Sequence, residues 1–315
     1  MKKKIAAVFL AAAMAVTMIA CGGSDTESGD TAASSADASA DAGDTQEDVQ
    51  EDTAAETADE EEITFESLSV MDNDEVSIVI TGIGTDDLWG YYSLDIELEN
   101  KSQDVTYMFS VDSASVNGLM SDPFYASEVT AGNKSVDTID FDMDTLEEYG
   151  IDQITDIEIA FRVYDSDTWE DLEEETVHVY PYGEENASVY ERTAQDTDQV
   201  LIDNDEMSLT LVSAGVDELW DYYALEVYLV NKTDAVVMFS VEDAAVNGYM
   251  CDPYWAESVN AGKTSYSTIS WSSSSLEELG ITDAESEIEE IELLFTDYDY
   301  DTYDTLYSET ITVNP

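Results

Sequence analysis

The chain has 315 residues, of which 74 are acidic and 9 are lysine or arginine, so its formal net charge at pH 7 is −65. A surface this acidic repels phosphate groups and anionic lipid headgroups, which excludes nucleic acid as a partner and leaves cations, basic proteins and neutral ligands. The length suits about two domains, and the aromatic residues, concentrated in the later two thirds, supply enough apolar material for packed cores.

The chain begins with MKKKIAAVFLAAAMAVTMIAC, in which three lysines precede an apolar stretch from Ile5 to Ala20 and then Cys21. A positive start and an apolar run predict a secretory signal peptide over residues 1–20, and the run is short for a transmembrane helix. The ending MIAC resembles the lipobox of bacterial lipoproteins, with Met18 where leucine is usual. The resemblance implies cleavage before Cys21, diacylglycerol on its sulfur and often a third acyl chain, such as palmitate, on its new amino group. We therefore expect lipid anchoring at the extracytoplasmic face of the cell membrane.

Residues 22–62 consist almost entirely of Gly, Ser, Ala, Thr, Asp and Glu and contain no aromatic residue. Such a composition cannot bury enough apolar surface to offset the entropy of ordering the chain. We expect residues 21–63 to form a disordered acidic linker that carries the lipidated cysteine and lifts the folded part off the membrane. A cation-binding tail is the alternative.

The segment VNGLMSDPFYASEV at residues 116–129 returns as VNGYMCDPYWAESV at residues 246–259. Over residues 108–132 and 238–262, 15 of 25 aligned positions are identical. Differences in length between the copies fall where loops are expected. We therefore predict a tandem duplication, with repeat 1 at residues 64–182, a linker at 183–198 and repeat 2 at 199–315. The repeated segment is either a ligand site or a scaffold, and scaffold is the favoured interpretation.

Apolar side chains recur with a period of two within each copy, which predicts half-buried strands. The clearest runs are Tyr92, Leu94, Ile96, Leu98, Tyr223, Leu225, Val227 and Leu229. Asn117–Gly118 and Asn247–Gly248 predict tight hairpins, and residues 144–150 and 274–280 each predict a short helix that ends at a glycine. Seven or eight short strands and one helical turn per copy predict an all-β fold of two tandem immunoglobulin-like antiparallel β-sandwiches.

An apolar strand ending in Asn-Lys-Ser/Thr, followed by MFSV, VNG, DP, AG and a strand of the form I-x-L-x-F, resembles immunoglobulin-like modules of secreted lipoproteins from Gram-positive gut bacteria. The resemblance covers nearly all of residues 64–315. It carries over no catalytic residue, and we expect no cofactor.

Aromatic residues near Asp and Asn are the first candidate site, because sugar-binding surfaces combine ring stacking with hydrogen bonds. The candidates are Trp89, Tyr91, Tyr125, Trp220, Tyr222 and Trp255. Packing in the core and along sheet edges explains the same residues, because both aromatic sets recur in both copies, and it is the favoured interpretation.

Carboxylates at Asp297, Asp299, Asp301 and Asp304, in DYDYDTYD, are a weak candidate for binding Ca²⁺. A solvated acidic hairpin loop is the favoured alternative, since the spacing fails the EF-hand pattern. His178 is the only histidine and is expected at the surface, which excludes a Ser-His-Asp or multi-histidine site. Cys251 aligns with Ser121 and has no partner once Cys21 is lipidated.

These observations favour a non-enzymatic, membrane-anchored binding or spacer module. The alternatives are a surface protein that captures a glycan or solute and, less favoured, a surface hydrolase. The expected partners are the membrane, through the lipid anchor, and an envelope protein or glycan. One face of repeat 2 is more apolar, with Tyr228 and Val230 where repeat 1 has Glu97 and Glu99. We expect this stripe to contact the other repeat or a partner, or else to be covered by a neighbouring strand or the linker.

Overall fold

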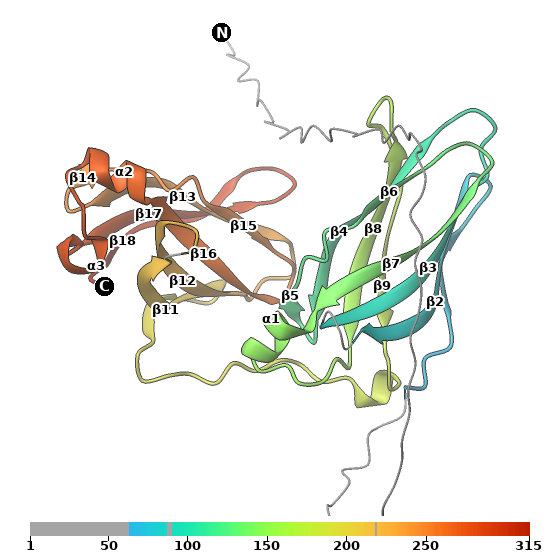
Figure 1. Ribbon diagram of the computed structural model, residues 1–315, viewed down its shortest axis with the longest axis horizontal. Coiled ribbons are helices and arrows are strands. Elements are labelled where there is room, and N and C mark those ends of the chain that lie inside the picture. The colour runs from blue at the N-terminus through green and yellow to red at the C-terminus, as the bar shows by residue number, and fades with distance from the viewer. Residues whose placement is uncertain (1–62, 87–89, 218) are drawn as a thin grey trace, which may run out of the picture. The chain divides into compact units, whose positions relative to one another are not determined.

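The computed structural model describes residues 63–86, 90–217 and 219–315, and this part of the chain is all-β, built from antiparallel sheets (Figure 1). The all-β prediction is confirmed. The expected signal peptide, Cys21 and the acidic linker, together with Trp89, lie outside the described residues. Among the helices described, none is long and apolar enough to cross a membrane.

Repeat 1 contains nine strands and one α-helix in its described residues. They are β1 Leu68–Asp72, β2 Val76–Asp86, β3 Tyr91–Asn100, β4 Tyr107–Val116, β5 Leu119–Met120, β6 Ala126–Val129, β7 Lys134–Asp142, α1 Met143–Glu148, β8 Ile157–Asp165 and β9 Asp171–Val179. The segment that follows contains a short 3₁₀ turn, η1 Glu184–Asn186, and no further strand before residue 199.

Repeat 2 has the same order of strands and a second short helix. Its elements are β10 Gln199–Asp203, β11 Met207–Asp217, β12 Tyr222–Asn231, β13 Val237–Val246, β14 Tyr249–Met250, β15 Ala256–Val259, β16 Thr264–Ser272, α2 Ser273–Glu278, α3 Ala284–Glu287, β17 Ile291–Asp299 and β18 Thr305–Val313. Helix α3 was not predicted, and it lies in the segment where repeat 2 is longer than repeat 1.

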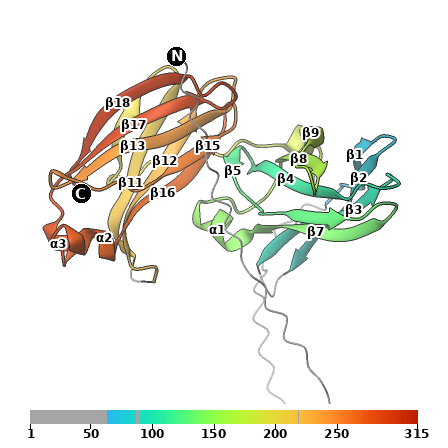
Figure 2. The ribbon, with the colours of Figure 1, turned by 90° about the horizontal axis from the view of Figure 1, so that it is seen from above.

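The pairing of strands is the same in both repeats. Strands β1-β2-β3-β7 form one sheet of repeat 1, and β5-β4-β8-β9 form the other, with β6 on β4. In repeat 2 the corresponding orders are β10-β11-β12-β16 and β14-β13-β17-β18, with β15 on β13, as Figure 2 shows for β13, β17 and β18. A register shift at Ile80/Gly82 returns at Leu211/Ser213, so even the irregularities are duplicated.

Two hydrophobic cores follow from the alternation of side chains. In β3, Tyr92, Leu94, Ile96 and Leu98 are all buried, as the period of two predicts. They meet residues of the second sheet, such as Phe109 and Phe161, in a cluster confined to repeat 1. The cluster of repeat 2 has the same construction around Phe239 and Phe295.

The predicted turns and helices are present. Asn117 and Gly118 have φ of 51° and 86°, and Asn247 and Gly248 have 51° and 80°, so both residues of each hairpin adopt the left-handed conformation that Asn-Gly tolerates. Helix α1 begins where the Asp142 side chain accepts the N–H of Thr145, and α2 begins with the same bond from Ser275 to Ser272.

Candidate interaction surfaces

Two of the six aromatic candidates belong to the scaffold. Trp255 is 8% exposed and lies in the core of repeat 2, where its indole N–H donates to Ser267 Oγ at 2.9 Å. Tyr125 is half-buried against the core of repeat 1, and its hydroxyl donates to Asp137 at 3.1 Å. Trp255 is thus covered by the core, which corrects its selection as a surface candidate, whereas Tyr125 is only partly covered.

Tyr91, Trp220 and Tyr222 lie at or beside the corresponding turn of each repeat, whereas Trp89 lies outside the described residues. Trp220 is 69% exposed in the β11–β12 turn, where Asp217 Oδ1 accepts the N–H groups of Leu219 and Trp220 at 2.9 and 3.1 Å. Tyr222 is half-buried beside a shallow hollow of about 490 Å³, and Tyr91 is 41% exposed at the same position of repeat 1. The hollow is lined by Ser213, Ala214, Gly215, Val216, Asp217, Tyr222, Ala224, Glu226 and Thr268.

The most exposed aromatic rings in the described residues lie in the segments DPFY and DPYW, which also contain Tyr125 and Trp255. Phe124 is 93% exposed and Tyr254 is 90% exposed, and each directly precedes the less exposed aromatic residue of its pair. Both adopt left-handed backbone conformations, with φ of 42° and 52°. Their N–H groups donate to Asp122 and Asp252 two residues earlier, at 2.8 and 3.0 Å. The Asp side chain therefore holds a turn that aims the first ring outward.

A second pair of exposed rings lies in the β8–β9 and β17–β18 hairpins. Trp169 is 66% exposed with φ of 64°, and Tyr303 is 62% exposed with φ of 57°. Trp169 stacks on Tyr164 with ring centroids 5.4 Å apart, and the guanidinium of Arg162 lies over the Tyr164 ring at 4.6 Å. Tyr164 thus packs against one face of the Trp169 ring, which remains at the surface.

Tyr266, on β16 of repeat 2, is the centre of a junction between the repeats. Its ring stacks on Tyr149 of repeat 1, with centroids 3.9 Å apart and an interplanar angle of 6°. Its hydroxyl is 3.0 Å from the hydroxyl of Tyr190 and accepts the Nε–H of Arg192 at 3.0 Å. Burial raises the pKa of Tyr149 to about 12, so this ring is neutral at physiological pH.

The segment between the repeats packs against the same rings. Arg192 lies over the Tyr228 ring at 5.5 Å and forms a bidentate ion pair with Asp198 at 2.6 and 2.8 Å. Hydrogen bonding by Arg192 holds the pKa of Asp198 below its usual range. Tyr228 and Tyr266 also pack against the core cluster of repeat 1. The apolar stripe at Tyr228 is therefore covered both by the linker and by repeat 1, so each of the two expected kinds of coverage contributes.

Backbone pairing extends the junction. The N–H of Thr264 donates to the carbonyl of Gly118 at 3.1 Å, and β16 pairs in parallel with β5 between Thr264 and Leu119. A single nine-stranded sheet results, which runs from β10 to β9. The amide of Asn260 donates to Ser113 Oγ at 3.0 Å. Lys263 Nζ lies 2.8 Å from Glu158 Oε2, with both side chains more than four-fifths buried.

A hollow of about 930 Å³ lies beside this junction, and its wall is strongly acidic. The carboxylates that line it are Asp112, Asp122, Glu158, Glu174, Glu175 and Glu257. Burial raises the pKa of Glu257, although Ser265 and Ser267 donate to its carboxylate at 2.8 and 3.0 Å. The hollow attracts cations and repels anions.

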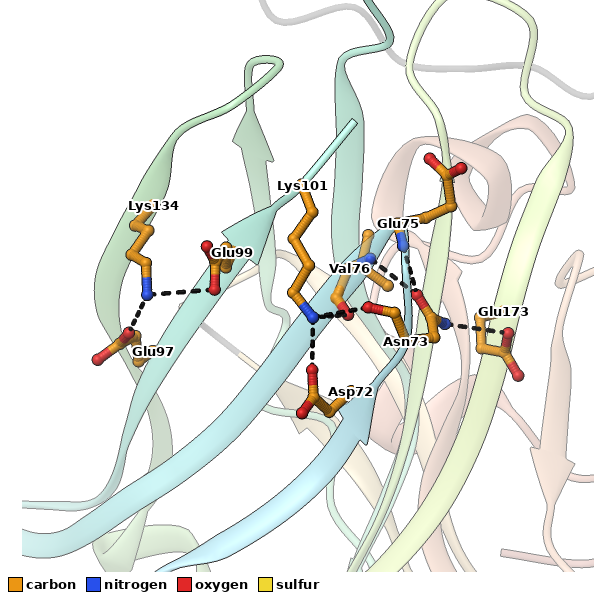
Figure 3. A network of polar contacts seen from close by, with 9 residues as sticks. All are labelled: Asp72, Asn73, Glu75, Val76, Glu97, Glu99, Lys101, Lys134 and Glu173. Carbon is orange, nitrogen blue, oxygen red and sulfur yellow. Dashed lines mark hydrogen bonds and ion pairs between the residues drawn. The ribbon is translucent and has the colours of Figure 1, made fainter. Parts of the chain in front are cut away.

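In each repeat, a lysine directly after β3 or β12 joins the end of that strand to the turn after the first strand. Lys101 forms an ion pair with Asp72 and donates to the carbonyl oxygens of Asn73 and Val76 at 2.7 and 3.1 Å (Figure 3). In repeat 2, Lys232 does the same with Asp203 at 2.6 Å and with the carbonyl of Asn204 at 2.7 Å. The lysine of the Asn-Lys-Ser/Thr motif therefore has a structural role.

The structure does not gather the acidic candidates for Ca²⁺. Asp297 is buried on the core side of β17, whereas Asp299 accepts the N–H groups of Asp301 and Thr302 at the exposed hairpin. In the described ranges no three His, Cys, Asp or Glu side chains are placed to hold a metal ion. His178 is at the surface, as expected, with Nδ1 2.8 Å from Asp156. Cys251 is a free, partly buried thiol.

No protein-family model matches the chain, and no curated protein sequence matches it. Among solved structures, the chain is similar to the YadV chaperone, with 10% identity, a TM-score of 0.24, and coverage of 70% of this chain and 92% of that one. It is also similar to red sea bream transglutaminase, with 11% identity, a TM-score of 0.22 and coverage of 76% and 31%. The Amycolatopsis orientalis exo-chitosanase CsxA has 12% identity, a TM-score of 0.22 and coverage of 74% and 26%. The chain thus spans under a third of these two enzymes, and at such scores the likeness carries no argument about function.

Proposed function

We propose that this chain is a lipid-anchored extracytoplasmic protein in which two immunoglobulin-like modules form a non-catalytic binding or spacer unit. The observation that carries the proposal is the junction at Tyr266. It combines ring stacking, an ion pair and a backbone hydrogen bond between the repeats. A spacer needs its modules held in a fixed order, and this junction supplies the contacts that hold them.

The anchoring part of the proposal rests on Cys21 and the lipobox-like MIAC sequence. Cys21→Ser removes the sulfur that would carry diacylglycerol. We expect the variant to leave the membrane fraction or to accumulate unprocessed, as measured by cell fractionation and by mobility on gels. A variant that stays in the membrane fraction with normal mobility contradicts lipid anchoring. Ser24→Ala, which changes a nearby residue without removing the acylated sulfur, serves as the control.

Capture of a neutral glycan is the second candidate, and the hollow beside Tyr222 favours it. Trp220 offers an exposed ring, and Tyr222, Asp217 and Glu226 offer a further ring and hydrogen-bond acceptors within one small surface. A glycan array probed with residues 58–315 tests this candidate. Trp220→Ala should remove any binding, and Trp169→Ala, an equally exposed ring on another hairpin, should leave it unchanged. Binding that survives Trp220→Ala contradicts the assignment.

A further inference from the structure

The junction between the repeats joins two unlike surfaces. Repeat 1 contributes a hairpin edge made of Asn117, Gly118 and Leu119 with the neighbouring Glu158. Repeat 2 contributes a tyrosine face, made of Asn260, Lys263, Thr264, Tyr266 and Tyr228. Each repeat has a position for both kinds of surface, but the junction uses only one from each repeat. One surface of each kind is therefore left unused. The unused hairpin edge is on repeat 2.

The hairpin edge of repeat 2 is intact, and no part of the chain that the structure describes covers it. It consists of Asn247, Gly248, Tyr249 and Met250, with Glu292 at the position of Glu158. Its backbone conformation repeats that of Asn117 and Gly118. Leu119 is 1% exposed, whereas Tyr249 at the same position is 60% exposed and Met250 is 66% exposed. Two large apolar side chains on so acidic a chain mark a surface that a partner covers.

The unused tyrosine face of repeat 1 does not fit this edge. Val136 stands at the position of Tyr266, and it is 79% exposed. Glu97 stands at the position of Tyr228, and Lys134 at the position of Thr264. Figure 3 shows Lys134 directed at Glu97 and Glu99, with distances of 3.0 and 3.1 Å. A second copy of this chain therefore offers no stacking ring, and two chains of net charge −65 repel each other.

We propose that the hairpin edge of repeat 2 docks the strand edge of a separate β-sheet module, on another polypeptide, that carries a lysine and a tyrosine arranged as Lys263 and Tyr266 are here. The lysine pairs with Glu292, as Lys263 pairs with Glu158. A backbone N–H of the docking strand donates to the carbonyl of Gly248, as the N–H of Thr264 donates to the carbonyl of Gly118. The tyrosine meets Leu279, which replaces Tyr149. This partner specifies the binding part of the proposed function and rests on that part alone, independently of the lipid anchor.

The test builds the missing tyrosine face on repeat 1. An acceptor chain of residues 58–315 carries Glu97→Tyr, Thr130→Asn, Asn133→Lys, Lys134→Thr and Val136→Tyr, which copy the residues of repeat 2 onto an exposed face. The same chain carries Tyr249→Glu and Met250→Glu, which block its own hairpin edge. Mixed with unmodified residues 58–315, it should form a 1:1 complex in analytical ultracentrifugation, with an association constant at least about tenfold above that of unmodified chains alone.

The controls isolate the hairpin edge. The acceptor chain mixed with a partner carrying Tyr249→Glu and Met250→Glu should show no association, and Glu292→Gln in the partner should weaken it. No complex between a folded acceptor chain and the unmodified chain overturns the proposal. Circular dichroism establishes folding, and an acceptor chain with only Asn133→Lys and Val136→Tyr, both at exposed positions, repeats the test with fewer changes. The Cys21→Ser experiment is unaffected by either outcome.

Discussion

Asp297 lies on the core face of β17, at the position that Val163 holds in β8, and only 2% of it is exposed. Burial, with a smaller contribution from the nearby Glu206, raises the pKa of this carboxyl from the usual 3.8 to about 6. One of its oxygens, Oδ1, has no hydrogen-bond partner. A buried carboxylate without a full set of partners destabilises the folded state whenever it is charged.

The sign of the pH dependence follows from the two pKa values. The unfolded chain releases this proton near pH 3.8, and the folded chain holds it until about pH 6. Between these values the folded state binds more protons, so the free energy of unfolding repeat 2 falls as pH rises, by about 1–3 kcal/mol in total. Asp297→Val should remove this decline and stabilise repeat 2 at pH 7, as measured by urea unfolding at pH 4.5 and 7.

The reciprocal change provides the control. Val163→Asp places a carboxyl in the core of repeat 1 and should destabilise that repeat at pH 7 more than at pH 4.5. Equal unfolding curves of Asp297→Val and the native chain at both pH values would mean that Asp297 is solvated and that its carboxyl titrates normally.

Substitutions of Trp255 and Trp220 compare a tryptophan of the core with a tryptophan of the surface. Trp255→Ala opens a cavity in the core of repeat 2 and should lower its free energy of unfolding by about 3–5 kcal/mol. Trp220→Ala removes a ring that is 69% exposed and should change the unfolding free energy by less than about 0.5 kcal/mol. Chemical unfolding followed by circular dichroism measures both. A large loss of stability in Trp220→Ala would place that ring in a core.

The sequence indicates which side chains of regular strands are buried, but not which ring of an adjacent aromatic pair is exposed. In DPFY and DPYW the alternation is interrupted by a turn that Asp122 and Asp252 hold through hydrogen bonds. The turn gives Phe124 and Tyr254 a left-handed backbone that no periodic pattern encodes. The sequence pattern therefore could not separate Tyr125 and Trp255 from their more exposed neighbours.

The strand ends show why the Asn-Lys-Ser/Thr motif recurs. Asn231 is 1% exposed, and its amide donates to the carbonyl oxygens of Ala235, Val259 and Asn260 at 2.8, 2.8 and 3.1 Å. Its oxygen accepts the N–H of Thr233 at 2.9 Å. Asn100 is equally buried and makes the corresponding bonds in repeat 1. One amide thus joins the end of a strand to two loops.

Replacing this amide should be costly. Asn231→Ala leaves buried carbonyl oxygens without donors, and we expect the free energy of unfolding repeat 2 to fall by about 2–4 kcal/mol. Asn231→Asp keeps the shape and the acceptor but removes both donors, so it should also destabilise the repeat at pH 7. Thr268→Ala, at an exposed position of β16, is the control for urea unfolding. A loss below about 0.5 kcal/mol in Asn231→Ala would show that water replaces the amide.

At the scale of elements, local chemistry was predictable and irregularities were not. The alternation of apolar and polar residues predicted strands such as β3 and β12, and the Asn-Gly pairs predicted the hairpins. Each of these features depends on residues close in sequence. The register shift at Val111/Ser113, which returns at Val241/Asp243, depends on pairing with a distant strand. Helix α3 depends on an insertion whose polar residues carry no clear period.

At the scale of the whole molecule, contacts between the repeats show how far the sequence alone predicts the structure. The difference between Tyr228 and Glu97 indicated a contact, because an apolar side chain replaced a charge on one face. The partners of that contact could not be read from the sequence, since Tyr149, Tyr190 and Arg192 belong to a helix end and a linker without periodic pattern. Their roles become visible only when the fold places them around Tyr266.

Tyr266→Val tests whether these rings hold the repeats together. Valine is the residue of repeat 1 at this position, Val136, and it suits an exposed strand, so β16 should still form. The substitution removes the stack on Tyr149 and the hydrogen bonds of the hydroxyl with Tyr190 and Arg192. We expect the unfolding free energy of each core to change by less than about 1 kcal/mol. The distribution of distances between spin labels on the two repeats should broaden markedly.

Lys263→Asn, which also copies the residue of repeat 1, provides the comparison because it removes only the ion pair with Glu158. That ion pair is more than four-fifths buried, so its loss leaves Glu158 without its cation, whereas the ring stack stays in place. The distribution of distances between spin labels should therefore broaden less in Lys263→Asn than in Tyr266→Val. A narrow distance distribution in Tyr266→Val would show that backbone pairing between Thr264 and Gly118 suffices to order the repeats. Unfolding of repeat 2 in the same variant would instead place Tyr266 in the core of its own repeat.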